Sequence, residues 1–151
     1  MGTPSLHTET TVCLEQRHTM RASGVHTSEA CTNSVRVKVT SRFSHAETEP
    51  PRWFFTYTVR ITNEGSETVQ LVSRHWIITN ESNEIEEVTG LGVVGHQPTL
   101  EPGQAFEYTS GSHLSTPFGS MRGTYQIVLK DGTHFDATIA EFALTEPQTV
   151  H

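Results

Sequence analysis

Three glycines near the middle of the chain, Gly90, Gly92 and Gly95, match the G-x-G-x-x-G pattern of dinucleotide-binding proteins. In those proteins the glycines form a turn between a strand and a helix, and the first amides of the helix bind a pyrophosphate. Here Pro98, which has no amide hydrogen, and a Pro-Gly turn at residues 102–103 follow directly. Because a helix cannot run through two such breaks, the sequence excludes a dinucleotide-binding crossover.

Two interpretations of this glycine loop, residues 90–95, remain. In the first, the glycines allow positive φ angles or close backbone approach in a tight connection between strands. In the second, successive backbone amides form a concave nest that binds an anion such as pyrophosphate. We expect Gly92 or Gly95 to be structural, because these glycines flank Val93 and Val94, an apolar pair that should anchor the loop to the core.

Arg74 and His75 are the residues that could add positive charge to an anion site at the glycine loop. Arginine is suited to this role because its guanidinium forms two parallel hydrogen bonds with an oxyanion. In a strand, Arg74 and Trp76 share one face while His75 takes the other. The structural alternative is an arginine stem packed beside a core tryptophan, or the mirror arrangement with His75 inward.

His134 and Asp136 are candidates for a metal site, because residues two apart in a strand face the same side. An imidazole and a carboxylate so placed could hold a divalent ion, with His113 as a third ligand. The alternative is a hydrogen-bonded or ion-paired couple on the solvent face, with Phe135 in the core, since two ligands alone do not make a metal site.

Motifs of catalysis are missing from the sequence. It contains neither H-E-x-x-H nor G-x-S-x-G, and both cysteines, Cys13 and Cys31, precede the part that we expect to fold. We therefore expect no enzymatic activity. The same cysteine positions give no disulfide or zinc framework, which favours a reducing compartment, the cytoplasm. Arginines among Ser and Thr near the N-terminus leave a mitochondrial presequence as the alternative.

The formal net charge is −7 at pH 7, and the only lysines are Lys38 and Lys130. Nucleic-acid binding depends on cationic contacts to phosphates, so we expect no polynucleotide partner. The chain has no apolar run near the length of a transmembrane helix, and its first residues lack the apolar segment of a secretory signal. We therefore expect no membrane association.

Residues 1–32 are polar and lack any hydrophobic period, which predicts a disordered tail ahead of a folded domain at residues 33–151. The domain alternates apolar and polar residues, has no sustained helical period, and contains an Asp-Gly hairpin signal at residues 131–132. The sequence therefore predicts an all-β sandwich of about seven antiparallel strands. The strands are expected at residues 34–40, 53–61, 68–79, 83–88, 105–109, 123–129 and 134–144.

Five segments of the domain carry motifs of one family, namely Val69–Leu71, Arg74–Trp76, Gly90–Pro98, Tyr108–Gly111 and Thr116–Tyr125. Together they resemble the ApaG domain family. They occur in the family's order, and the resemblance covers residues 34–151. It implies a fibronectin type III or immunoglobulin-like β-sandwich, and it implies that the glycine loop takes pyrophosphate-type ligands. Bacterial members are linked genetically to cobalt resistance and magnesium efflux. In eukaryotes the domain is appended to some F-box proteins and to a polymerase-delta-interacting protein.

The expected function is that of a non-enzymatic binding module whose partner is another protein or a second copy of the chain. One alternative is a small-ligand binder, in which Gly90, Gly92 and Gly95 enclose pyrophosphate or a nucleotide polyphosphate and Arg74 or His75 adds charge. The other is divalent-metal handling, involving cobalt or magnesium. Apart from these two ligand types, we expect no cofactor.

Overall fold

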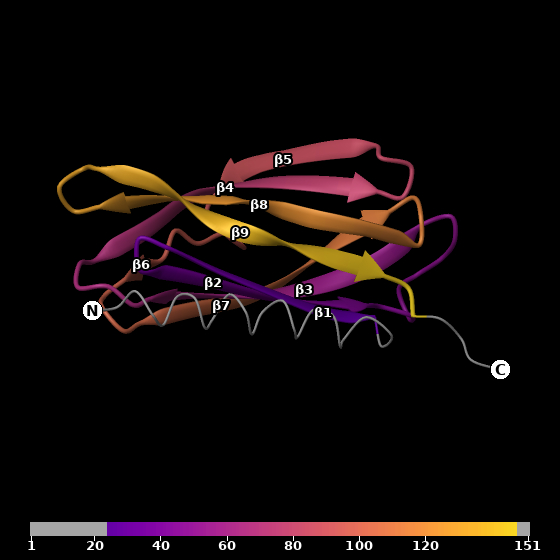
Figure 1. Ribbon diagram of the computed structural model, residues 1–151, viewed down its shortest axis with the longest axis horizontal. Coiled ribbons are helices and arrows are strands. Elements are labelled where there is room, and N and C mark those ends of the chain that lie inside the picture. Colours follow the sequence, from indigo (N-terminus) through magenta and orange to yellow (C-terminus); the bar gives the residue numbers. More distant parts are fainter. Residues whose placement is uncertain (1–23, 148–151) are drawn as a thin grey trace.

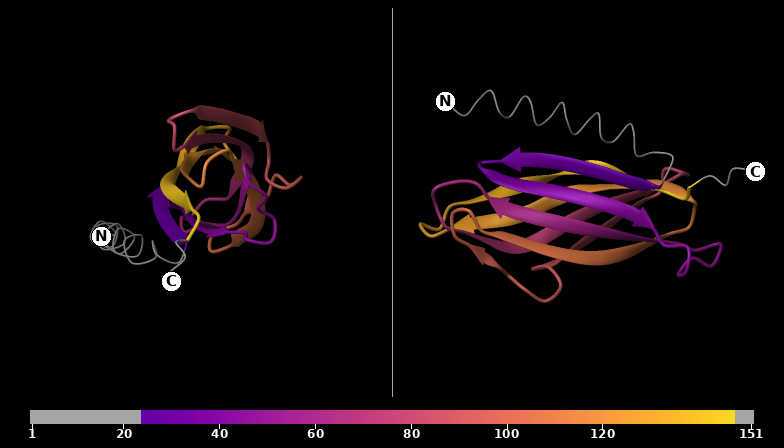
Figure 2. Two further views of the ribbon diagram at one scale, coloured as in Figure 1. Left: turned by 90° about the vertical axis from the view of Figure 1, so that its right-hand side faces the viewer. Right: turned by 90° about the horizontal axis from the view of Figure 1, so that it is seen from below.

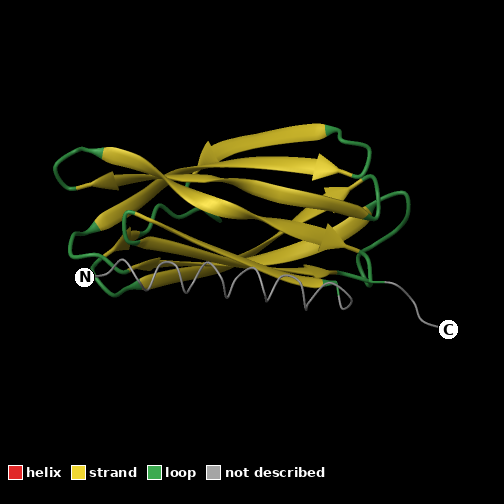
Figure 3. Cartoon of the chain, viewed as in Figure 1, coloured by secondary structure: helices red, strands yellow, loops and turns green. Residues whose placement is uncertain are grey.

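The computed structural model describes residues 24–147, which form nine β-strands and the loops between them (Figures 1 and 3). No helix in this part of the chain is long and apolar enough to cross a membrane. The strands are β1 (Val25–Thr32), β2 (Val35–Phe43), β3 (Trp53–Asn63), β4 (Val69–Asn80), β5 (Ile85–Leu91), β6 (Thr99–Leu100), β7 (Ala105–Leu114), β8 (Phe118–Leu129) and β9 (His134–Thr145).

The strands form two stacked antiparallel sheets, which confirms the predicted sandwich (Figure 1). One sheet has the order β1-β2-β3-β7, and the other has the order β5-β4-β8-β9, with β6 paired to β4. On one side the sheets meet, because β1 and β2 pack against β9. On the other side β5 and β7 are the outermost strands of their sheets, as the end-on view in Figure 2 shows.

The core lies between the sheets and follows the alternation of the sequence. Val35, Val37 and Val39 of β2 are all buried. Tyr57 of β3 and Trp76 of β4 come from opposite sheets, and their ring centroids lie 5.2 Å apart. Burying one such side chain stabilises the fold by about 1.5–3 kcal/mol. The apolar residues of the predicted strands therefore pack together in one continuous core.

The predicted boundary of the disordered tail at residue 32 is wrong. β1 lies inside the predicted tail and pairs with β2 along its whole length. His26 and Ser28 of this strand are buried. The His26 Nε2 atom lies 2.8 Å from Thr145 Oγ1, and Ser28 Oγ donates to the Ala140 carbonyl at 2.8 Å.

These hydrogen bonds to β9 explain why the sequence pattern did not reveal β1. A buried polar side chain is tolerated when it has hydrogen-bond partners, and the strand therefore needs no alternating apolar residues. The remainder of the predicted tail, residues 1–23, lies outside the described residues.

The other expected strands all occur, most of them longer than predicted, and the two-residue β6 is an addition. The Asp-Gly signal is also confirmed as a tight hairpin between β8 and β9. Gly132 has a φ of +91°, and the Leu129 amide donates a hydrogen bond to the Thr133 carbonyl at 2.8 Å. Only a residue without a side chain adopts such a φ at no cost.

Candidate functional site

The glycine loop folds back on itself directly after β5. Gly92 has a φ of +61° and Gly95 a φ of +83°. A Cβ atom on Gly92 would also overlap the carbonyl oxygen of His96. The Val93 amide donates to that carbonyl, and the His96 amide donates to the Val93 carbonyl, each at 2.8 Å. The backbone conformation that we predicted for Gly92 or Gly95 is therefore present at both glycines.

The apolar pair beside these glycines behaves only in part as expected. Val93 is fully buried and anchors the loop, whereas Val94 is 52% exposed. The expectation for Val94 is wrong because its φ of +42° continues the turn and leaves the side chain in solvent. The imidazole of His96 lies 5.9 Å from the ring of Phe106 on β7. The loop therefore reaches from β5 to β7. It covers one end of the open side of the sandwich, which is the side where β5 and β7 are the outermost strands.

Several amides that an anion nest would use already have acceptors within the protein. The register between β4 and β8 shifts at Val72, and the Val72 carbonyl accepts hydrogen bonds from the loop. The Gly92 amide donates to it at 2.8 Å, and the Gln97 side-chain amide donates at 2.9 Å. Because the Val93 and His96 amides are paired as well, the loop is organised by internal hydrogen bonds.

Arg74 lies against the first glycine of the loop. It stands opposite Gly90 across the β4–β5 pair. A Cβ atom at Gly90 would come within 2.8–2.9 Å of three guanidinium atoms, so the guanidinium occupies the space that a side chain would need. Its Nη1 atom donates to the carbonyls of Leu91 at 2.9 Å and Gly92 at 2.8 Å. Arg74 therefore holds the loop through its carbonyl groups.

Buried tyrosines lie on the core side of Arg74. Tyr125, which stands opposite Arg74 on β8, forms a short hydrogen bond with the hydroxyl of Tyr108. Burial raises the pKa of both phenols well above the ordinary tyrosine value, and the positive charge of Arg74 lowers each by a smaller amount. Burial also raises the pKa of Tyr57 on β3, which a hydrogen bond with Ser110 partly offsets. All three phenols therefore remain neutral donors at pH 7.

His75 lies on the opposite face of β4 from Arg74, as the strand alternation predicted. It is half-exposed, and its Nε2 atom lies 2.7 Å from the Glu87 Oε1 atom on β5. Arg74 carries its charge to the inner face of the sheet, and His75 contacts the Glu87 carboxylate on the outer face. The structure therefore places both residues beside β5 without bringing their side chains together at one ligand.

The metal candidates are not brought together. His134 lines a cavity of about 390 Å³ at one end of the sandwich with Asn63, the last residue of β3, whereas His113 pairs with Phe54 at the beginning of β3. The His113 ring packs against Phe54 at a tilt of 58°, with centroids 4.6 Å apart. Asp136 accepts a weak hydrogen bond from Gln126 at 3.4 Å. Residues 24–147 contain no group of three or more His, Cys, Asp or Glu side chains placed to hold a metal ion.

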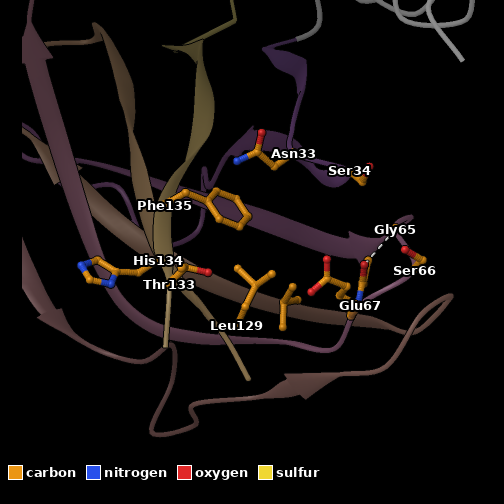
Figure 4. A pocket seen from close by; sticks show the side chains of 11 residues that line it. Asn33, Ser34, Gly65, Ser66, Glu67, Leu129, Thr133, His134 and Phe135 are labelled. Carbon is orange, nitrogen blue, oxygen red and sulfur yellow. Dashed lines mark hydrogen bonds between the residues drawn. The ribbon is translucent and has the colours of Figure 1, made fainter. Parts of the chain in front are cut away.

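Figure 4 shows the surroundings of His134 in this cavity. The imidazole is turned away from the carboxylate of Glu67, which lies across the cavity. His134 Nδ1 instead lies 3.3 Å from the Gly132 carbonyl of the hairpin turn. Phe135 is partly buried and packs against the core, as the structural alternative for this segment predicted.

The feature that the sequence did not reveal is a group of exposed apolar side chains at the β5 edge. Leu91 is 75% exposed and Ile85 is 63% exposed, and Val94 follows in the loop. Among the described residues, only one other large apolar side chain, that of Phe118, is exposed. Strand alternation predicts that Ile85 and Leu91 lie on the same face of their strand. Only the sheet order shows that this strand lies at the edge of its sheet.

Comparison with known proteins identifies the family of this chain. The model of the ApaG domain matches residues 43–129, which run from the end of β2 to the end of β8. The chain belongs to the ApaG domain family. Protein ApaG of Dechloromonas aromatica is 52% identical over 124 residues, a match that covers 80% of this chain and 98% of the relative. Protein ApaG of Anaeromyxobacter dehalogenans strain 2CP-1 is 56% identical, covering 82% and 99%.

ApaG relatives of known structure share the same sandwich. The crystal structure of the ApaA protein from Bordetella pertussis has a TM-score of 0.74 and 52% sequence identity, covering 76% of this chain and 95% of that one. The resemblance that the sequence motifs indicated is therefore confirmed at the level of both family and fold. Nearly the whole length of these ApaG relatives is matched, so the site described above lies within the part that the family shares.

Proposed function

We propose that this ApaG domain is a non-enzymatic module that binds an extended segment of a partner protein along β5. The observation that carries the proposal is that Ile85, Leu91 and Val94, each more than half exposed, lie on one edge strand and its loop, with Ile85 at the beginning of β5 and Leu91 at its end. Exposed large apolar side chains along one element are typical of interaction sites. Single exposed ones are ordinary, so their concentration on β5 is what supports binding there.

The backbone of β5 supplies the second part of the argument. Among the described strands β5 has only β4 as a neighbour, so its outer edge presents unpaired amide and carbonyl groups. An added strand would pair with these groups and place alternate side chains against the exposed ones. Residues 81–87 carry four glutamates, so the partner segment that fits best alternates basic with apolar side chains.

Other functions receive less support from the described residues. The histidine nearest β5, His75, lies with its Nε2 atom 2.7 Å from the exposed Glu87 carboxylate. Pyrophosphate binding by the glycine loop would require amides that now donate to Val72, Val93 and His96. Divalent-metal binding would require ligands closer together than His134 and His113.

The direct test is site-specific photo-crosslinking in the cells that make the protein. A photoreactive phenylalanine derivative replaces Leu91 in one variant and Ile85 in another. The matched control carries it at Glu107, which is exposed on β7, the outermost strand of the other sheet. Because all three positions are exposed, the substitutions should leave the fold intact.

We expect discrete protein adducts from positions 91 and 85 and none of the same mass from position 107. An adduct of twice the chain mass would identify the partner as a second copy. Equal labelling at all three positions, or no adduct from β5, would refute the proposal.

A further inference from the structure

A cleft of about 400 Å³ opens between the two sheets on the side where β5 and β7 are outermost. It is lined from both sheets, by β3 and β7 on one wall and by β4, β5 and β8 on the other. Polar atoms make up more of its lining than apolar atoms. Its apolar part includes Trp76 and Met121, which are almost fully buried, and Val88, which is only partly buried. The glycine loop closes the neighbouring end of the same side, so the cleft is the part of the open side that the loop leaves uncovered.

The cleft contains one cationic side chain, Arg74, whose charge no carboxylate balances. The ion pairs of the described residues join Arg36, Arg60 and His75 to glutamates, and none of them includes Arg74. The guanidinium uses Nη1 for two loop carbonyls. Its Nε and Nη2 atoms make no hydrogen bond to the described residues. A half-buried guanidinium with one free edge is matched by the two oxygens of a carboxylate.

Hydroxyl groups lie on the facing wall. Ser110 pairs with Tyr57 and Ser112 pairs with Phe55 across β3 and β7, so both serines share the inner face with residues of the core. The Tyr57 phenol is neutral at pH 7, and burial raises its pKa further. His113 also borders the cleft, but its ring packs at a tilt against Phe54 at the outer face. The donors directed inward are therefore one guanidinium edge and a set of neutral hydroxyls.

Glu86 is the one acidic residue at this cleft. It stands opposite Ile78 across the β4–β5 pair, on the same face as Arg74. A carboxylate near the mouth repels a multiply charged anion more strongly than a singly charged one. The partly buried side chain of Val88 offers contact to hydrocarbon, which inorganic phosphate does not carry.

We propose that this inter-sheet cleft binds a singly charged carboxylate attached to a short apolar body. The carboxylate oxygens accept from the free edge of Arg74 and from the hydroxyls of the β3–β7 wall, and the apolar body lies against Val88, the partly buried apolar side chain of the lining. This site is separate from the outer face of β5 that the proposed function uses. It is likewise separate from the amides of the glycine loop.

The test is a titration of the full chain with hexanoate, followed by ¹H–¹⁵N NMR of backbone amides and of the Arg74 Nε–H group. Hexanamide has the same shape without the charge, and pyrophosphate has charge without the apolar body. Arg74→Gln removes the charge, and Ser112→Val fills the cleft wall with a strand-favouring residue. Ser73→Ala changes an outer-face hydroxyl of β4 and serves as the matched control.

Hexanoate should shift the Arg74 Nε–H signal and amides of β5 and β7 with one saturating curve, and hexanamide should not. Arg74→Gln should weaken binding about tenfold or more, since hydrogen bonds to a charged group are the stronger kind. Ser112→Val removes no hydrogen bond to the described residues. It should weaken hexanoate binding, while the well-dispersed amide signals show that the domain stays folded. Equal binding of hexanamide, tighter binding of pyrophosphate, or unchanged affinity in Ser112→Val would overturn the proposal. So would the absence of shifts at Arg74.

Discussion

Replacement of Gly92 by alanine should destabilise the domain more than replacement of any other glycine of the loop by alanine. Two features of the structure act together at this position. Its φ of +61° is unfavourable for a residue with a side chain, and the added Cβ would overlap the His96 carbonyl oxygen. That oxygen belongs to a rigid backbone bridge in which Val93 and His96 exchange two hydrogen bonds of 2.8 Å. The overlap therefore cannot be relieved by rotating a side chain.

The expected cost follows from these two terms. The left-handed conformation costs about 1–2 kcal/mol for an L residue. Breaking the two bridge hydrogen bonds adds about 1 kcal/mol each. Gly92→Ala should thus lower the free energy of unfolding by about 3 kcal/mol or more. For a domain of this size that corresponds to a fall in Tm of roughly 10–15 °C.

Gly95→Ala is the matched control, because Gly95 has a φ of +83° but no atom within 4 Å of an added Cβ. It carries only the conformational term, about 1 kcal/mol, or roughly 4 °C in Tm. Urea unfolding and thermal melts of both variants measure the difference, with and without pyrophosphate. If Gly92→Ala were no less stable than Gly95→Ala, the structural account of the loop would be wrong. A large pyrophosphate-dependent rise in the wild-type Tm would favour the anion nest instead.

Four further predictions concern the residues around Arg74 and the β5 edge. Tyr125→Phe should cost about 1–3 kcal/mol because it leaves the buried Tyr108 hydroxyl unpaired, and the double Phe variant should cost less than the sum of the single changes in urea unfolding. Because burial raises the pKa of both phenols in the folded state, the unfolded state loses protons first as pH rises above about 10. Stability should therefore fall above that pH, and the double Phe variant should show a flatter decline in melts at pH 8–11. Gly90→Ala should displace the flexible guanidinium of Arg74 and weaken hexanoate binding in NMR titrations, while a full loss of folding would contradict this reading. Leu91→Lys should change the free energy of unfolding by no more than about 0.5 kcal/mol, since Leu91 is 75% exposed, yet abolish the crosslink formed from position 85.

The strands that the sequence predicted are those whose burial depends on apolar side chains. In β2, valine alternates with polar residues, and each valine is buried. Alternation with a period of two residues indicates which face of each strand is buried. The sandwich could therefore be predicted without knowledge of the strand order. β1 could not be predicted in this way, because His26 and Ser28 are buried through hydrogen bonds to β9. Such partners are distant in the chain and leave no local period.

The candidate site was predictable in its residue types and not in its arrangement. Alternation correctly separated Arg74 from His75, but only the β4–β5 register places Arg74 on Gly90. The exposure of Ile85 and Leu91 likewise follows from the position of β5 at a sheet edge. Sheet order is a long-range property, so neither the Arg74 contact nor the β5 surface can be derived from short motifs.

Hydrogen–deuterium exchange on the crosslinked partner complex tests the β5 proposal most directly. In the free domain, the β5 amides that point away from β4 should exchange fast, because no described strand pairs with them. Strand addition predicts that amides within residues 85–91 become protected in the complex, while those of β7 at residues 105–114 keep their rates. Protection confined to β7 or to the glycine loop, with unchanged exchange in β5, would contradict the account.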